Sequence, residues 1–377
     1  MKDVFIVADN IISPLGITTE ENFSNLTKGI SGIREHVNTA LSAQPFFASL
    51  LDEHTNLLDE KTNSFTRFEK LLIASISDAL KNCNVDIKDK KTILIISTTK
   101  GNVSLIENGV VDAGLKRRVA LHSSAELIGK YFHCGSEPLV VSNACISGLV
   151  AMLVGKRLLQ SGGYDHAVVA GGDVITKFVL SGFESFQATS SVPCKPFDAA
   201  RNGINLGEGA GTVILSAGEN NSRGIRITGG SVSNDANHIS GPSRTGQELC
   251  QAICKAMEEA AVSDHDIGLI CAHGTATVYN DEMEALAISL ANLQAVPVNS
   301  LKGYFGHTLG AAGIIESVVS IHSLKENLVL PSLGFSQSGV SKPLNVSTAL
   351  QNTPLINCLK TASGFGGCNA AIIFNKE

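Results

Sequence analysis

The sequence predicts an α/β protein made of two copies of one αβ unit. Apolar, strand-like runs alternate with segments of helical spacing along the chain. These runs are rich in β-branched residues, which is typical of sheets covered by helices on both faces. A weak internal repeat relates the two halves of the chain, and a polar stretch around residue 222 separates them. We therefore expect an N-terminal half over 1–222 and a C-terminal half over 223–377.

Hydrophobic periodicity locates the individual elements. Short apolar runs rich in Val and Ile indicate strands, and apolar residues at helical spacing indicate helices. Strands are expected at residues 4–8, 92–97, 138–142, 167–171, 211–216, 225–229, 267–272, 296–299 and 370–374, and helices at 66–82, 146–160, 247–261, 281–292 and 311–324.

The internal repeat pairs strands, loops and one helix start. In each copy a strand ends in a polar loop that contains glycine, and a second strand leads to a helix of small residues. Pseudo-symmetry would then place Cys145 and His307 at equivalent helix starts, facing one another. The paired segments are 93–101 with 268–274, 140–148 with 296–310, and the helix after Gly148 with 311–316.

Composition and charge exclude several classes of protein. Of the 377 residues, 44% are hydrophobic and 36 are glycine, which suits a compact globular enzyme. The net charge of −6 and the lack of an excess of Lys and Arg give no support for nucleic-acid binding. No apolar segment approaches the roughly 18 residues that span a membrane. The first apolar stretch, at residues 4–8, is too short for a signal peptide and is expected to be a strand.

The nine cysteines are expected to be free thiols. Their number is odd and their spacing forms no disulfide framework, which indicates a reducing compartment and a cytoplasmic protein. Cys250 and Cys254 fall within a helical pattern without histidines at ligand spacing, so no metal site is expected. The basic run at 116–118 is interpreted as a solvated face.

Cys145 is the first candidate for chemistry. It lies between a predicted buried strand and a helix of small residues. The first turn of a helix presents unpaired N–H groups and a positive dipole end, which favour a thiolate and can hold an oxyanion. The alternative is a small buried hydrophobic residue, which is what most free cysteines are.

Two histidines are candidate partners of that thiol. His307 lies in a glycine- and alanine-rich run, where the nearby helix dipole favours a neutral imidazole. An N-cap histidine would fit the same turn, but Lys302, five positions earlier, favours a functional site. His273 follows a strand, at the strand end where ligands bind in open α/β sheets. For Asp281 and Glu284, which come next, helix capping is at least as well supported as catalysis.

Five motifs occur in a fixed order along the chain. They are Asn143-Ala144-Cys145; residues 195–203 running into 207–211; His273-Gly274-Thr275-Ala276-Thr277 with Asp281 and Glu284; Lys302 with Gly306-His307; and Gly364-Phe365-Gly366-Gly367 with Asn369. In order and spacing they resemble the β-ketoacyl-acyl carrier protein synthases of the decarboxylating Cys-His-His class. Any single motif is weak, but five in register are highly specific.

The resemblance implies a thiolase-like fold in an αβαβα arrangement and a condensing enzyme, an acyltransferase of the 3-oxoacyl-[acyl-carrier-protein] synthase type. Cys145 would take an acyl group from an acyl carrier protein, and malonyl carrier protein would then lose CO₂ and attack the acyl-enzyme. The product would enter fatty acid, polyene or polyketide synthesis. The carrier protein supplies the phosphopantetheine arm, so the enzyme itself would bind no cofactor. A homodimer is implied, with a heterodimer of related subunits as the alternative.

The same resemblance gives roles to individual residues. His273 and His307 would donate N–H groups to the enolate that forms as CO₂ leaves, and neutral imidazoles suit this role because carboxylates would repel the charge. Lys302 would set the local electrostatics, with Glu284 as its partner and Asp281 as a further supporting carboxylate.

Further roles concern the substrate. The backbone N–H groups of Cys145 and Phe365 would form the oxyanion hole, and Phe365 would act as a gate over the cysteine. Thr275 and Thr277 would hydrogen-bond a pantetheine amide. Ile146 is bulkier than expected beside the nucleophile and would narrow the acyl pocket. For docking of an acidic carrier protein, the available basic residues are Arg67, Lys70 and the run 116–118.

Other functions were weighed on the same residues. A degradative thiolase needs a second catalytic cysteine, for which Cys368 is the candidate, and would leave Lys302 unexplained. An initiating synthase of the Cys-His-Asn class would have asparagine in place of His307. A non-catalytic, chain-length-determining partner subunit would keep the fold but tends to lose the nucleophile, and Cys145 is present.

Overall fold

The computed structural model describes residues 2–52, 55, 57, 64–107, 111–218, 224–236 and 240–377. Within them, two sheets are joined edge to edge into one sheet of 11 strands through a short pairing of Phe5 and Ile6 with residues 225–226. The N-terminal sheet has the order β1 (Val4–Ile12), β8 (Gly209–Ala217), β6 (His166–Asp173), β4 (Thr92–Ser97), β5 (Leu139–Val141). The C-terminal sheet has the order β9 (Ile225–Asn234), β16 (Cys368–Lys376), β15 (Asn357–Gly364), β10 (Ile267–Ala272), β11 (Pro297–Ser300), β13 (Asn345–Val346).

The two sheets share one topology, which confirms the expected repeat. In the N-terminal sheet, the first two neighbour pairs are antiparallel and the last two are parallel. The C-terminal sheet follows the same sequence of directions from β9 to β11. β4 therefore corresponds to β10 and β5 to β11, which are the strands that the repeat pairs. The expected boundary at residue 222 falls outside the described residues.

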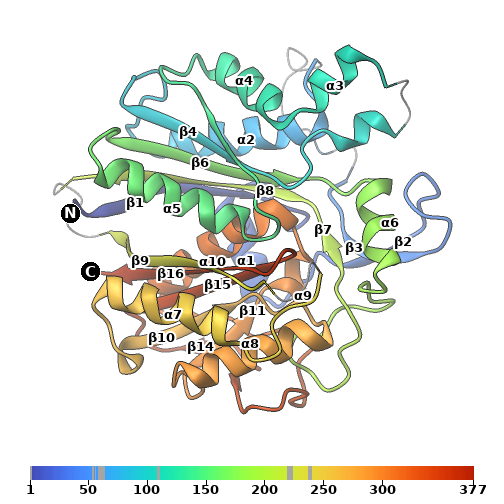
Figure 1. The fold of residues 1–377 in the computed structure, drawn as a ribbon, viewed down its shortest axis with the longest axis vertical. Helices are drawn as coiled ribbons and strands as arrows, with labels where there is room; N and C mark the ends of the chain where they lie inside the picture. The colour runs from blue at the N-terminus through green and yellow to red at the C-terminus, as the bar shows by residue number, and fades with distance from the viewer. Residues whose placement is uncertain are drawn as a thin grey trace.

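Helices cover the sheets in the layers αβαβα (Figure 1). α2 and α4 pack on the outer face of the N-terminal sheet, and α7 packs on the outer face of the C-terminal sheet with α8 beside it. α5 and α10 lie between the two sheets, where the largest hydrophobic core is found. These helices are α2 (Arg67–Lys81), α4 (Leu121–Phe132), α5 (Ser147–Gln160), α7 (Gln247–Ala260), α8 (Val278–Leu290) and α10 (Ala312–Glu326).

The two central helices cross in close contact because each carries a glycine at the crossing. A Cβ atom on Gly148 of α5 would lie 2.8 Å from the backbone N of Ile314, and one on Gly313 of α10 would lie 2.7 Å from that of Leu149. Real Cβ atoms are not found at such distances, so only glycine fits at either position. The crossing brings the N-termini of α5 and α10, and the loops before them, to one place.

Several elements were not expected from the sequence. β15 was missed because Lys360 interrupts its apolar run, although this side chain is fully buried. The helix α4 was also missed, although it is 12 residues long. Most of the other missed elements are short or polar, so their periodicity is weak. They are α1 (Thr19–Thr27), α3 (Ala113–Val119), α6 (Lys177–Ser185), α9 (Lys302–Phe305), β13, the pair β12 (Leu328–Val329) and β14 (Gln351–Asn352), and the sheet of β2 (Arg34–His36), β3 (Phe46–Ser49) and β7 (Leu206–Gly207).

Candidate active site

Cys145 lies in the turn between β5 and α5, as the sequence predicts. Ala144, just before it, has φ of 43°, a left-handed conformation that a non-glycine residue adopts at a cost. Ser147 fixes this turn, because its hydroxyl accepts a 2.8 Å hydrogen bond from the Asn143 N–H and donates a 2.6 Å one to the Ala144 carbonyl. The turn holds the thiol at the wall of a cavity of about 100 Å³.

Several other predicted site residues line the same cavity. His273 comes from the end of β10, and His307 from the loop between α9 and the 3₁₀ turn Leu309–Ala311 that leads into α10. Both line the cavity with Cys145, and so do Thr275, Thr277 and Phe365. Pseudo-symmetry thus predicted a real meeting of loops from the two halves.

The two histidine rings meet edge to face. Their centroids are 5.2 Å apart with an interplanar angle of 84°. The Nδ1 atoms of His273 and His307 are buried and have no hydrogen-bond partner among the described residues. Burial, and then the nearby charge of Lys302, hold the pKa of each imidazole well below its usual range. Both rings are therefore neutral at neutral pH, which is the form that suits an N–H donor to a developing negative charge.

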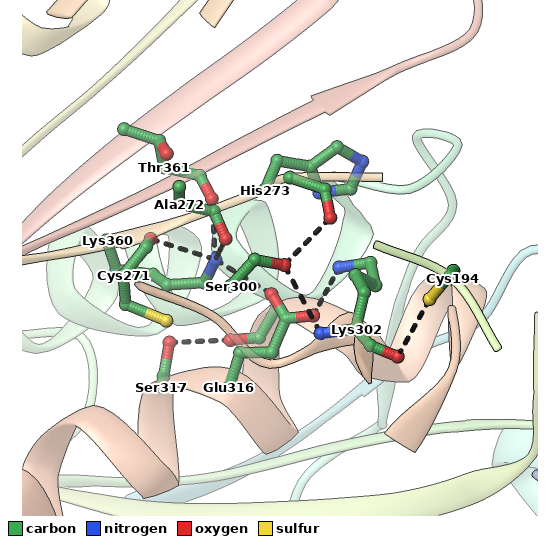
Figure 2. Close-up of polar contacts among 12 residues, drawn as sticks. Cys194, Cys271, Ala272, His273, Ser300, Lys302, Glu316, Ser317, Lys360 and Thr361 are labelled. Atoms are coloured by element: carbon green, nitrogen blue, oxygen red, sulfur yellow. Dashed lines mark hydrogen bonds and ion pairs between the residues drawn. The ribbon is translucent and has the colours of Figure 1, made fainter. Parts of the chain in front are cut away.

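The charge that acts on the histidines belongs to a fully buried triad. Lys302 forms an ion pair with Glu316 of α10, and Lys360 of β15 approaches the other carboxylate oxygen at 2.7 Å. Figure 2 shows the carboxylate of Glu316 reached by both lysines, with His273 beyond them. Burial opposes ionisation of Glu316, but the two lysines outweigh it and lower its pKa. The expectation that Glu284 pairs with Lys302 is wrong, because Lys302 pairs with Glu316 of α10 and Glu284 bonds other groups.

Glu284 and Asp281 hold loops in place. Glu284 accepts hydrogen bonds of 2.7 Å from the N–H groups of both His273 and Gly274, and one of 2.6 Å from the Thr361 hydroxyl. Asp281 accepts from the Phe197 N–H at 2.7 Å, which ties the 195–203 motif to the histidine loop. Burial raises the pKa of Asp281 to about 7, although the Phe197 hydrogen bond opposes that shift.

Burial acts against the thiolate form of Cys145. It raises the pKa of the thiol to about 12, and the neighbouring Cys368 adds to the shift. The helix N-terminus acts in the opposite direction and favours the thiolate. With a pKa raised in this way, the thiol must lose its proton during the reaction.

Some of the residues predicted to contact the substrate line the cavity, and others do not. Thr275 and Thr277 lie on the cavity wall, with their hydroxyl oxygens 2.9 Å apart. Phe365 stands at the end of the β15–β16 hairpin and is 38% exposed. The Ile146 side chain is fully buried in the core between the sheets and does not line this cavity, so its expected narrowing of an acyl pocket stays a prediction.

Sequence reasoning missed several residues of the site, among them Glu316, Lys360 and Phe183. Glu316 and Lys360 are charged residues within otherwise apolar or small runs, and that pattern was the signal available for both. Phe183 of α6 lines the cavity, and its ring lies 6.5 Å from that of His307 and 5.7 Å from that of Phe365. Its segment was not recognised as a helix, so nothing pointed to it.

Two of the proposed docking residues are engaged in ion pairs. Arg67 forms an ion pair with Glu208 at 2.8 Å. The Arg118 guanidinium donates one hydrogen bond to each carboxylate oxygen of Glu69, both at 2.6 Å. Lys116 and Arg117 on α3 are exposed. In the described part of the chain, no group of three His, Cys, Asp or Glu side chains could hold a metal ion. None of the helices described there is long and apolar enough to cross a membrane.

Comparisons with known proteins identify the family to which the chain is similar. Residues 1–221 match the family model "Beta-ketoacyl synthase, N-terminal domain", and residues 225–336 match "Beta-ketoacyl synthase, C-terminal domain". A putative mitochondrial 3-oxoacyl-[acyl-carrier-protein] synthase of Schizosaccharomyces pombe is 28% identical over 100% of this chain and 99% of its own length. A 3-oxoacyl-[acyl-carrier-protein] synthase 2 of Staphylococcus aureus is also 28% identical, over 100% of this chain and 98% of its own.

Solved structures show the same fold. The ishigamide ketosynthase/chain length factor superposes with a TM-score of 0.92 at 24% identity, covering 100% of this chain and 99% of that one. A β-ketoacyl synthase from Burkholderia phymatum gives a TM-score of 0.90 at 23% identity, with 100% of both chains covered. A ketosynthase described in complex with its chain length factor, from Xenorhabdus doucetiae, gives 0.90 at 24% identity over 100% of this chain and 98% of that one.

Proposed function

Since the chain belongs to the β-ketoacyl synthase family, whose models match most of its length, we propose that it is an active condensing enzyme with Cys145 as its nucleophile. The reaction is a decarboxylative Claisen condensation between an acyl group on Cys145 and malonyl-acyl carrier protein. One observation carries this proposal: a buried thiol and two neutral imidazoles, from the two halves of the chain, line one cavity.

The first step transfers an acyl group to the enzyme. The Cys145 sulfur attacks the thioester carbonyl of acyl-carrier protein, a C–S bond forms to Cys145, and the C–S bond to phosphopantetheine breaks. Because the pKa of the thiol is about 12, its proton must move to a base as attack proceeds, and a neutral imidazole of the pair is available. That proton leaves on the phosphopantetheine thiol. The backbone N–H groups of Cys145 and Phe365 are the proposed oxyanion donors.

The second step forms the new carbon–carbon bond. His273 and His307 donate N–H groups to the thioester oxygen of malonyl-carrier protein, whose C–CO₂ bond breaks to give CO₂ and an enolate. The enolate carbon attacks the acyl carbonyl, the C–S bond to Cys145 breaks, and the thiolate takes up a proton. Burial, together with the positive charges of Lys302 and Lys360, supports this step because it lowers the pKa of both histidines and keeps them neutral.

The carrier protein supplies the phosphopantetheine arm, and Thr275 and Thr277 are its proposed hydrogen-bond partners. We propose the N-terminal half at 1–222 and the C-terminal half at 223–377 as the two units that build the site. A dimer is part of the proposal, either of two copies of this chain or of this chain with a related subunit. Fatty acid, polyene or polyketide synthesis are the pathways that such a product would enter.

A second candidate is a chain-length-determining partner subunit without activity of its own. Two of the similar structures contain a chain length factor beside a ketosynthase, which favours considering it. The intact set of Cys145, His273, His307 and Lys302 favours the active enzyme. A degradative thiolase is disfavoured, because Cys368 does not line the cavity and its Sγ lies 3.3 Å from the Phe365 carbonyl.

The test is intact-protein and peptide mass spectrometry after incubation with acyl-carrier protein thioesters. We expect one acyl adduct on Cys145, its loss in Cys145→Ala, and its retention in Cys194→Ala, which removes a buried thiol outside the cavity. Adding malonyl-carrier protein should release the adduct as a β-ketoacyl product. No adduct on Cys145 with any chain length tested, alone or with a related subunit, would contradict the enzyme and support the partner subunit.

A further inference from the structure

Phe365 lines two neighbouring spaces. One is the cavity of about 100 Å³ that Cys145 also lines, called here the inner cavity, and the other is a cleft of about 450 Å³, called here the outer cleft. Ala188, Pro242 and Thr277 are among the other residues that line both, so the two spaces adjoin. A group that passes from the outer cleft into the inner cavity meets the Phe365 side chain.

Two aromatic rings of one segment contact Phe365 from different sides. Phe183, on α6, lines the inner cavity and stacks on Phe365 with ring centroids 5.7 Å apart at 26°. Phe186, at the end of α6, lines only the outer cleft and lies 5.5 Å from Phe365 at 59°. Both distances fall in the range where aromatic pairs attract each other beyond the burial of area alone.

The end of α6 is closed by hydrogen bonds, and open space lies beside the turn that carries Phe365. The hydrogen bonds run from the Gln187 N–H to the Glu184 carbonyl at 2.9 Å and from the Ala188 N–H to the Phe183 carbonyl at 3.2 Å. Gly366, next to Phe365, has φ of 86° and no neighbouring atom within 4 Å of a Cβ position. A displacement of the Phe365 ring would break its contacts with both Phe183 and Phe186.

From these contacts we infer that Phe186 is a positioning residue that holds Phe365 closed over Cys145 and so sets how readily a thioester reaches the nucleophile. Phe186 is 57% exposed and does not line the cavity, and its ring contact is with Phe365, so the inferred effect on Cys145 runs through Phe365. This inference rests on the proposed function only in taking Cys145 as the nucleophile. Loss of the Phe186–Phe365 pair should raise the population of the open conformation, in which Phe365 is displaced from Cys145, about two- to tenfold.

The test measures access to Cys145 rather than catalysis. The full-length protein is treated with iodoacetamide at fixed pH, and alkylation of the Cys145 peptide is followed by mass spectrometry. We expect Phe186→Ala to raise the rate about two- to tenfold and Phe186→Tyr, which keeps a ring, to leave it unchanged. The matched control is Phe178→Ala, because Phe178 lies on the same helix, is 53% exposed and lines neither space.

Buried Cys194 serves as an internal reference for loosening of the whole fold. A Cys145 rate in Phe186→Ala equal to that of Phe178→Ala would overturn the inference, as would a parallel rise at Cys194. The alkylation needs neither carrier protein nor condensation. If Phe186→Ala accelerates alkylation but no acyl adduct forms from carrier thioesters, the positioning role stands and only the proposed function fails.

Discussion

Gly148 and Gly313 pack against each other where α5 crosses α10, and this contact sets the distance between the two halves of the site. Each glycine approaches the backbone of the opposite helix so closely that a Cβ atom would lie under 3 Å from a backbone nitrogen. Cys145 stands just before the first helix, and His307 precedes the second. A change in the crossing would therefore change the relation between nucleophile and histidine.

Substitution at this crossing should destabilise the protein and impair the site. Gly313→Ala places a methyl group 2.7 Å from a backbone nitrogen, and overpacking of this kind costs about 1–3 kcal/mol. Urea denaturation would measure the free energy of unfolding. The control is Gly182→Ala on α6, where a Cβ has no neighbour within 4 Å and helix propensity predicts unchanged or slightly higher stability. Equal stability of Gly313→Ala and wild type would refute the tight crossing.

Removing the charge of Glu316 should be strongly destabilising. Glu316→Gln leaves Lys302 and Lys360, both fully buried, without their counter-ion, and breaking a buried pair typically costs about 3–5 kcal/mol. Denaturation curves across pH provide the check. Because the folded state lowers the pKa of Glu316, its contribution is present above the unfolded pKa and is lost as pH falls through the folded one. Glu282→Gln, at an exposed hydrogen bond to Ser341, is the control, and similar losses in both variants would contradict the role of the triad.

Alkylation of Cys145 should depend steeply on pH. With a thiol pKa of about 12, the thiolate fraction grows about tenfold for each pH unit between 7 and 9. The second-order rate with iodoacetamide, read at the Cys145 peptide, should therefore climb through this range without a plateau. A plateau below pH 8 would show that the helix N-terminus outweighs desolvation and that the resting enzyme holds a thiolate.

Charge reversal on α3 should weaken binding of an acyl-carrier protein without changing the turnover of small thioester substrates. Lys116 and Arg117 are exposed and basic, whereas Arg67 and Arg118 are tied to Glu208 and Glu69. The double variant Lys116→Glu, Arg117→Glu should raise KM for acyl-carrier protein about fivefold at low salt, with a smaller effect at high salt. Turnover of a free acyl-pantetheine thioester should not change. If KM for the carrier stays at the wild-type value, docking occurs elsewhere, and Lys70 on α2 is the remaining candidate.

The sequence by itself determined most of the regular architecture and the residue types of the site. The alternation of apolar strands with helices appears as a pattern among residues that are close together in the sequence. Periodicity could therefore locate β4, β10, α5 and α10. The repeat then related Cys145 to His307. Both inferences rest on local pattern and on order along the chain, which a single sequence contains.

Tertiary structure alone decided which groups touch. Lys302 pairs with Glu316 of α10 rather than with Glu284, which bonds the His273 N–H. Ile146 packs in the core between the sheets, whereas Cys145, next to it in the chain, lines the cavity. The raised pKa of Cys145 comes from desolvation by groups distant in sequence. The contacts of a side chain, its burial and the charges around it depend on which distant segments pack together. The order of residues along the chain does not specify that packing.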